Sequence, residues 1–244
     1  DHLQTMYQKV PPSPMNGREV VRVILLLTSL GLMVANLGLI FLWVPMELVM
    51  GQIQRIFYFH VPIAWVSFLA VSIVFVASIL YLWQGGRKWD ILANASAEIG
   101  VLFTTLMLIS GATWAKPVWG VWWTWDPRLT TSLIMWLIYI AYLMLRAYAP
   151  TSAQGARYAA VLGIVGFVDV PIVYFAVEWW RNIHPEMVIG PLAESGDLEG
   201  SMTITLLFSM LTFTALFSYL LWERVSLASS EDALDFVRGL EGVQ

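Results

Sequence analysis

The chain has 244 residues, of which 59% are apolar and only 12% are charged. A soluble domain carries about a quarter charged residues, so the composition excludes an ordinary soluble globular protein and predicts a surface that largely faces lipid. The net charge of -4 excludes a nucleic-acid-binding protein, and the lack of cysteine excludes disulfides, thiolate metal sites and a catalytic thiol.

Six apolar runs are long enough to cross a bilayer as helices, which takes roughly 20 residues each. Backbone groups find no water in the hydrocarbon and no alternating barrel pattern is present, so we predict an all-α integral membrane protein with six transmembrane helices. The first run is too long for the apolar part of a signal peptide, so we expect a true span and no cleavable signal. In chain order the predicted spans are 23–44, 57–83, 93–113, 129–148, 158–179 and 202–222.

The basic residues between the spans predict the orientation, because cytoplasmic segments are enriched in Lys and Arg. With both termini in the cytoplasm, the inner segments hold nine of the 13 basic residues and the outer segments hold four. We therefore predict a cytoplasmic arm at 1–22, a single transmembrane domain at 23–222 and an acidic cytoplasmic tail at 223–244. The predicted outer segments are 45–56, 114–128 and 180–201.

Two of the three histidines lie at the same depth on the predicted outer side. His60 is near the start of the second span, where Pro62 is expected to kink or start the helix and aim His60 into the bundle mouth. His184 precedes Pro185 beyond the fifth span, in an expected turn, whereas His2 lies in the cytoplasmic arm. Either outer histidine could simply hydrogen-bond to headgroups or backbone. Two neutral imidazoles on separate segments could also supply both axial ligands of one iron porphyrin.

The segment 114–130, between the third and fourth spans, is rich in tryptophan. Its members are Trp114, Trp119, Trp122, Trp123 and Trp125. An interfacial aromatic belt explains single tryptophans at span ends, but it explains this density poorly. Pro117 is expected to open a short helix, in which spacing aligns Trp119 with Trp122 or Trp123 as a shelf for a flat apolar ligand. Asp126 ends this stripe, and we expect it to cap the fourth span or to pair with Arg128.

Basic side chains accompany these features on the predicted outer side. A guanidinium suits the propionates of haem by bidentate hydrogen bonding, whereas snorkelling to lipid headgroups explains each cation equally well. The sequence leaves open which of them binds a propionate. The four candidates are Arg55, Lys116, Arg128 and Arg181.

The string Trp119-Gly120-x-x-Trp123-x-Trp125-Asp126-x-Arg128-Leu129-Thr130 resembles the "WWD" signature of a haem-handling family that includes CcmC, CcmF and CcsA-type proteins. Six spans, with one outer histidine before the signature and one after it, resemble the CcmC branch along the whole chain. The resemblance implies a bacterial inner-membrane protein that presents non-covalent haem b on its periplasmic face. It also implies that His60 and His184 ligate the iron and that the signature loop lies against the porphyrin.

The resemblance implies partners as well. Haem would pass to the chaperone CcmE, which attaches it covalently through a histidine of its own, and the protein would associate with the ABC transporter pair CcmA and CcmB and with the small protein CcmD. The chain itself has no Walker A motif, so we expect no ATP hydrolysis. Whether it assists covalent attachment of haem to its partner stays open.

Two other functions would require different residues. A b-type cytochrome that carries electrons across the bilayer would need histidines at two depths, and the candidates here share one. A transporter that carries haem across could use the intramembrane acids Glu98, Asp169 and Glu178. Of these only Asp169 is deep, and Pro171 follows it closely, so its carboxylate is predicted to satisfy backbone groups freed by a proline kink.

Overall fold

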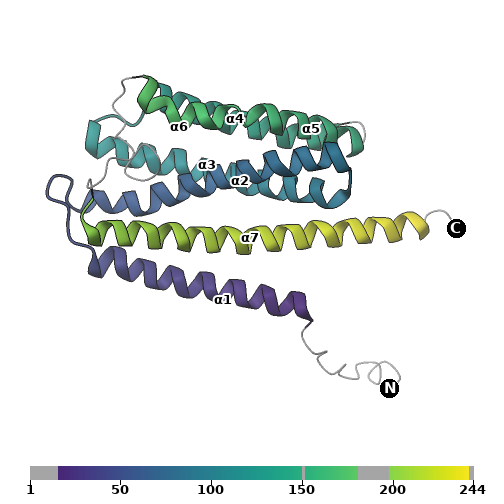
Figure 1. The fold of residues 1–244 in the computed structure, drawn as a ribbon, viewed down its shortest axis with the longest axis horizontal. Coiled ribbons are helices and arrows are strands. Elements are labelled where there is room, and N and C mark those ends of the chain that lie inside the picture. Colours follow the sequence, from purple (N-terminus) through teal and green to yellow (C-terminus); the bar gives the residue numbers. More distant parts are fainter. Residues whose placement is uncertain (1–15, 150–151, 181–197, 242–244) are drawn as a thin grey trace, which may run out of the picture.

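The computed structural model describes residues 16–149, 152–180 and 198–241, and within these ranges it contains helices and short connections but no strand (Figure 1). The predicted all-α class is therefore confirmed. A π-helical turn, η1 (Leu39–Trp43), extends the first helix, and a 3-10 helix, η2 (Gln52–Ile56), leads into the second. The α-helices are α1 (Gly17–Gly38), α2 (Phe57–Gln84), α3 (Arg87–Trp119), α4 (Pro127–Tyr148), α5 (Ser152–Gly166), α6 (Asp169–Trp179) and α7 (Gly200–Glu241).

Six helical segments of the described chain are long and apolar enough to cross a membrane, as predicted. Large apolar side chains such as Leu27, Leu30 and Val34 are exposed along them, which suits a surface solvated by lipid. The protein is therefore a multi-pass membrane protein. The segments are Gly17–Trp43, Gln52–Gln84, Arg87–Trp119, Pro127–Tyr148, Ala153–Trp179 and Gly200–Asp235.

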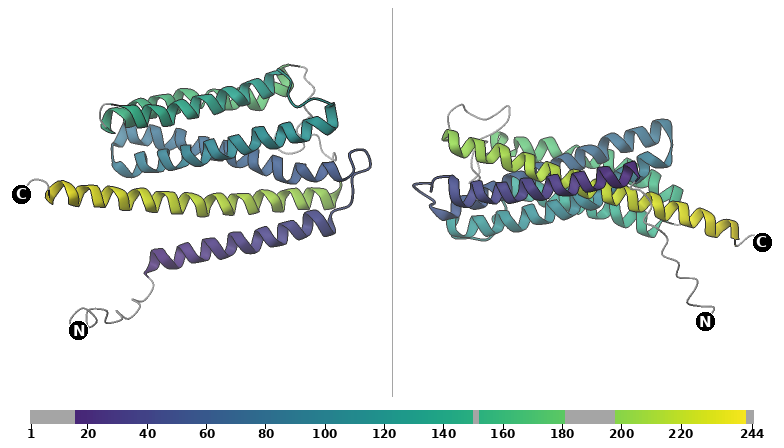
Figure 2. Two further views of the ribbon diagram at one scale, coloured as in Figure 1. Left: turned by 180° about the vertical axis from the view of Figure 1, so that it is seen from behind. Right: turned by 90° about the horizontal axis from the view of Figure 1, so that it is seen from below.

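The helices lie side by side in layers, as opposite views show (Figure 1, Figure 2). The layer of α4, α5 and α6 packs on α2 and α3, which are followed by α7 and then by α1 at the far edge. Ser209 of α7 donates a hydrogen bond of 2.8 Å to Asn36 of α1 and so ties this outer helix to the bundle. The start of α1 and the end of α7 lie at one end of the bundle, the termini end. The connection between α3 and α4 lies at the opposite end, the loop end.

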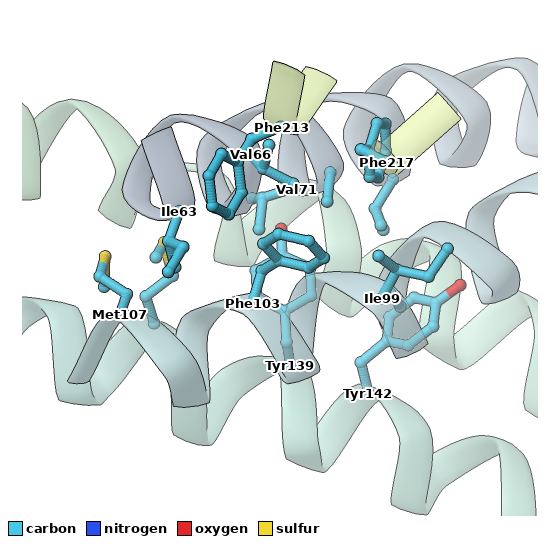
Figure 3. Packing of buried hydrophobic residues seen from close by; sticks show 14 of the residues in the cluster. Ile63, Val66, Val71, Ile99, Phe103, Met107, Tyr139, Tyr142, Phe213 and Phe217 are labelled. Atoms are coloured by element: carbon cyan, nitrogen blue, oxygen red, sulfur yellow. The ribbon is translucent and has the colours of Figure 1, made fainter. Parts of the chain in front are cut away.

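The core is formed where α2, α3 and α4 meet. Figure 3 shows Val66 and Val71 of α2 close to Phe103 of α3 and Tyr139 of α4, and all four are buried. The neighbouring α5 packs closely on α2 at Gly163. A Cβ built at this glycine would lie only 3.0 Å from side-chain atoms of α2. Inside a bilayer such close packing through small residues replaces the hydrophobic effect as the force that joins helices. The loop end is thus held by a rigid helical frame.

The fifth span is broken, which differs from the continuous helix predicted at 158–179. α5 ends at Gly166 and α6 begins at Asp169, with Pro171 in its first turn. The proline lacks an N–H and its ring clashes with the carbonyl four residues earlier, which interrupts the helix at Phe167. The role predicted for Asp169 is not supported, because its Oδ2 is buried without a hydrogen-bond partner among the described residues. The carboxylate instead lies at the positive end of the α6 dipole.

The first span begins earlier than predicted. Asn16 caps α1 by accepting a hydrogen bond from the backbone N–H of Glu19, and the Glu19 carboxylate accepts one from Asn16 N, each over 2.9 Å. This reciprocal capping box fixes the helix start at Gly17, so the predicted arm at 1–22 overlaps the first helical turns. His2 lies outside the described residues.

The tail predicted to begin at residue 223 is a continuation of α7 rather than a separate segment, since the helix runs unbroken to Glu241. Ion pairs join this extension to the bundle at the termini end. Arg87 of α3 donates to Asp232 over 2.6 Å, and Arg224 donates to Glu98 of α3 over 2.9 Å. Glu98, considered above as part of a haem path, is thus one half of an interhelical ion pair.

Candidate functional site

His60 lies on the first turn of α2 at the loop end, in contact with α3. Its Nδ1 lies 2.9 Å from the hydroxyl of Ser110, and its ring meets the indole of Trp114 edge-on with centroids 5.9 Å apart. The prediction that Pro62 starts the helix is wrong, because α2 begins at Phe57 and Pro62 lies inside it. The preceding 3-10 helix η2 sets the entry of the chain instead.

The tryptophan-rich segment has a different local structure from the one predicted. α3 continues through Pro117 to Trp119, so this proline lies in the last turn of a long helix and does not open a short one. Gly120 ends the helix with a φ of 77°, a left-handed conformation that glycine adopts without strain. The predicted loop at 114–130 therefore reduces to the seven residues 120–126 between α3 and α4. Trp114 and Trp119 belong to a helix, and the predicted stripe does not form.

Asp126 caps α4, which confirms one of the two roles predicted for it. Its Oδ1 accepts hydrogen bonds from the backbone N–H groups of Arg128 and Leu129 over 3.0 and 3.2 Å. Its Oδ2 accepts a third bond, of 2.7 Å, from the Thr124 hydroxyl. Pro127 occupies the first helical position, where its missing N–H costs nothing. These contacts tie the end of the loop 120–126, here called the tryptophan loop, to the start of α4.

A cavity opens at the loop end between α2, α3, α4 and the tryptophan loop. Its volume is about 160 Å³. Its wall is mainly apolar, with an imidazole and a guanidinium as its ionisable groups. The predicted site residues that line it are His60, Trp114, Trp119, Trp123 and Arg128.

The other two tryptophans of the segment do not line this cavity. Trp122 and Trp125 are 58% and 76% exposed, as expected for an interfacial aromatic belt. Three of the five tryptophans of the segment thus line the cavity. Trp125 packs behind the cavity wall, since its ring lies edge-on against that of Trp123 with centroids 5.7 Å apart.

The candidate cations are separated by the fold. Arg128 lines the cavity, whereas Arg55 lies over the ring of Phe41 at 5.6 Å from its centroid. Lys116 donates a hydrogen bond of 2.9 Å to the carbonyl of Gly120 and so helps to end α3. Arg181 and His184 lie outside the described residues.

The cavity wall carries hydrogen-bond donors without acceptors. The indole N–H groups of Trp114 and Trp123 are both buried and have no hydrogen-bond partner in the described part of the chain. A buried donor left unpaired costs about 1–3 kcal/mol. The lining itself, apolar and aromatic with His60 and Arg128 as its ionisable groups, suits an apolar molecule that carries an anionic group.

Three residues that contact His60 or line the cavity have no signal in the sequence. Ser110 and Gly111 of α3 contact the ring of His60, and Met50 lines the cavity from the connection between η1 and η2. A small residue within an apolar run is ordinary in a membrane helix, so no local pattern marks Ser110 or Gly111. Only the packing of α2 against α3 reveals them.

Fold and site together define a multi-pass helical membrane protein with a cavity lined by aromatic side chains at one end of its bundle. The family profile described as heme exporter protein C matches residues 9–234. The chain belongs to the heme exporter protein C family.

Individual relatives agree with this assignment. Heme exporter protein C of Bradyrhizobium diazoefficiens is 36% identical over 71% of this chain and 65% of its own length. Heme exporter protein C of Haemophilus influenzae is 36% identical over 72% of this chain and 71% of its own length. A putative cytochrome c biosynthesis ccmC-like mitochondrial protein of Marchantia polymorpha is 33% identical over 70% and 73%. The chain thus spans about two thirds of the length of these relatives.

Proposed function

We propose that the protein binds haem in the loop-end cavity and passes it on for the assembly of c-type cytochromes. The observation that carries this proposal is the convergence of one histidine, three tryptophans and one arginine on the same, mainly apolar cavity. The names of the relatives, heme exporter protein C and cytochrome c biosynthesis protein, support haem as the ligand. Haem is cargo here, held non-covalently as haem b, since the chain has no cysteine for a thioether bond.

The cavity wall fits the separate parts of a haem molecule. The neutral imidazole of His60 supplies one axial ligand to the iron. The indoles of Trp114, Trp119 and Trp123 bury the porphyrin, which contributes roughly 25 cal/mol per Å² of apolar surface removed from water. The guanidinium of Arg128 binds a propionate, and it is preferred over Arg55 and Lys116 because it alone of the three lines the cavity.

His184 supplies the second axial ligand in this proposal, with Arg181 nearby as a further propionate partner. Support comes from their place in the sequence, just after α6, which ends at the loop end. The described part of the chain contains no group of three His, Asp or Glu side chains that could hold a metal ion by themselves. An iron that arrives already bound in a porphyrin needs only axial ligands, and a histidine pair suffices.

The proposal includes the setting in the cell. The loop end faces the periplasm and the termini end faces the cytoplasm of a bacterial inner membrane, as the distribution of basic residues favours. Haem passes from the cavity to the chaperone CcmE, and CcmA, CcmB and CcmD are the associated subunits. The cavity lies at the loop end, the side from which a periplasmic acceptor would approach.

The test is a titration of the purified protein with haemin in detergent. We expect a Soret band at one haem per chain, which His60→Ala or His184→Ala weakens and His2→Ala leaves unchanged. His2 is a matched control because it is the remaining histidine of the chain and lies far from the loop end in sequence. An unchanged spectrum in the His60→Ala/His184→Ala double variant would overturn the ligand assignment.

A further inference from the structure

The ring of His60 is held from the side by α3. Within the described residues its ring makes a polar contact with Ser110, at 2.9 Å between Nδ1 and Oγ, although the two residues are 50 positions apart in the chain. Nε2 has no hydrogen-bond partner among these residues. A histidine that binds a metal through one ring nitrogen usually donates a hydrogen bond from the other, which fixes its tautomer and orientation.

The hydroxyl of Ser110 can play this part because its own proton has another acceptor. Ser110 Oγ donates to the backbone carbonyl of Met107 over 3.2 Å, one helical turn earlier. A hydroxyl has one proton and two acceptor lone pairs, so with its proton on the bond to Met107, Oγ can accept a hydrogen bond from His60. The ring then carries its proton on Nδ1 and leaves the Nε2 lone pair free.

Gly111 provides the space for this arrangement. A Cβ built at this position would lie 3.0 Å from Cε1 of His60, and 3.7 and 3.8 Å from its two nitrogens. The ring edge therefore rests against the α3 backbone, and even a methyl group at position 111 would displace it. Close packing of α2 on α3 fixes this contact, since a Cβ built at Gly100 on the same helix would likewise lie only 3.3 Å from the Cβ of Ala70 in α2.

We infer that Ser110 and Gly111 are positioning residues for His60: Ser110 selects the tautomer with a free Nε2, and Gly111 sets the plane of the ring toward the cavity. This inference rests on the proposed function, in which His60 Nε2 ligates haem iron. Neither residue touches the iron itself. Together they form a seat on α3 for a ligand that belongs to α2.

The first test removes the acceptor of the Nδ1 proton. Loss of an outer-shell partner typically costs 10–100-fold in metal affinity, so we expect Ser110→Ala to weaken haem binding by about tenfold or more. The midpoint potential of the bound haem should rise, because an imidazole without this hydrogen bond is a poorer donor to ferric iron. Ser110→Thr keeps the hydroxyl and should restore both values. Thr113→Ala is the matched control, since Thr113 also donates to its own helix, at 2.8 Å to Ile109 O, but is exposed.

The second test fills the space under the ring. Gly111→Ala should lower haem affinity at least as strongly as Ser110→Ala, because the ring must move from its seat. Gly31→Ala is the control, since a Cβ at Gly31 in α1 meets nothing within 4 Å. Thermal unfolding in detergent, followed without haem, shows whether each variant keeps its fold.

The outcomes separate this inference from the proposed function. If the wild-type protein binds no haem, or His60→Ala binds it normally, the proposed function fails. If His60→Ala loses haem while folded Ser110→Ala and Gly111→Ala keep the wild-type affinity and midpoint potential, the positioning role is overturned and the haem site stands.

Discussion

Adjacent tryptophans in the loop have opposite environments. Trp123 lines the cavity with its indole N–H buried, whereas Trp122 is mostly exposed and lies 6.0 Å from the ammonium of Lys116. The doubled tryptophan of the signature thus combines a cavity-lining side chain with an exposed one. A substitution that deletes one indole at a time can separate these roles.

Trp123→Ala should weaken haem binding, whereas Trp122→Ala should not. Burial of an aromatic side chain and its stacking contribute about 1–3 kcal/mol together, which corresponds to a loss of affinity of roughly 5- to 150-fold. Trp122→Ala is expected to stay within about twofold of wild type, since no cavity contact is lost. The measurement is haemin titration of both variants at equal protein concentration. Equal affinities in the two variants would mean that the loop is a membrane anchor and no part of the haem site.

At the scale of elements, the site depends on how α3 ends and how α4 begins. The loop between them has only seven residues, and both of its ends are fixed, by Gly120 in a left-handed conformation and by the Asp126 cap. Trp123 lies between these fixed points. Its position in the cavity therefore depends on the cap as well as on its own packing.

Asp126→Ala should loosen the loop and the start of α4. Loss of an N-cap side chain costs about 0.5–2 kcal/mol, so we expect a lower unfolding temperature in detergent and a lower yield of haem-loaded chaperone. Asp126→Asn is the matched variant, because asparagine caps helices as well as aspartate does but carries no charge. If the asparagine variant loses haem transfer as fully as the alanine variant while keeping its stability, the charge of Asp126 matters more than the cap.

The sequence predicts the number of spans better than their ends. Apolar runs mark the part of each helix that lies in lipid, whereas α3 continues beyond its predicted 93–113 into polar turns at both ends, where hydropathy gives no signal. The prediction that Pro117 opens a helix is wrong, because α3 runs through this proline to Trp119. The left-handed Gly120 was the better boundary signal. The break between α5 and α6 follows from Pro171. The sequence predicts a proline kink here, but it predicts the span as one helix.

At the scale of the whole molecule, the site could be predicted in part because its chemistry is carried by unusual residue types. A histidine beside a proline and a cluster of indoles are rare enough to be recognised, and the fold brings His60 and three tryptophans together. The contacts of Ser110 and Gly111 with His60 could not be predicted, because His60 lies on another helix and about 50 positions earlier in the chain. His184 and Arg181 remain predictions, since they lie outside the described residues.

The orientation of the bundle decides which compartment the cavity serves. Leu48 at the loop end is 99% exposed, and Ser230 lies exposed on the extension of α7 at the termini end. Because the chain has no cysteine, Leu48→Cys and Ser230→Cys each create a single thiol. A membrane-impermeant maleimide should label Leu48→Cys in cells whose outer membrane alone is permeable, and Ser230→Cys only after the inner membrane is opened. The charge distribution predicts this result, since eight described basic residues lie toward the termini end and three toward the loop end. The reverse labelling pattern would place the cavity in the cytoplasm, and delivery of haem to a periplasmic chaperone would then be impossible from this site.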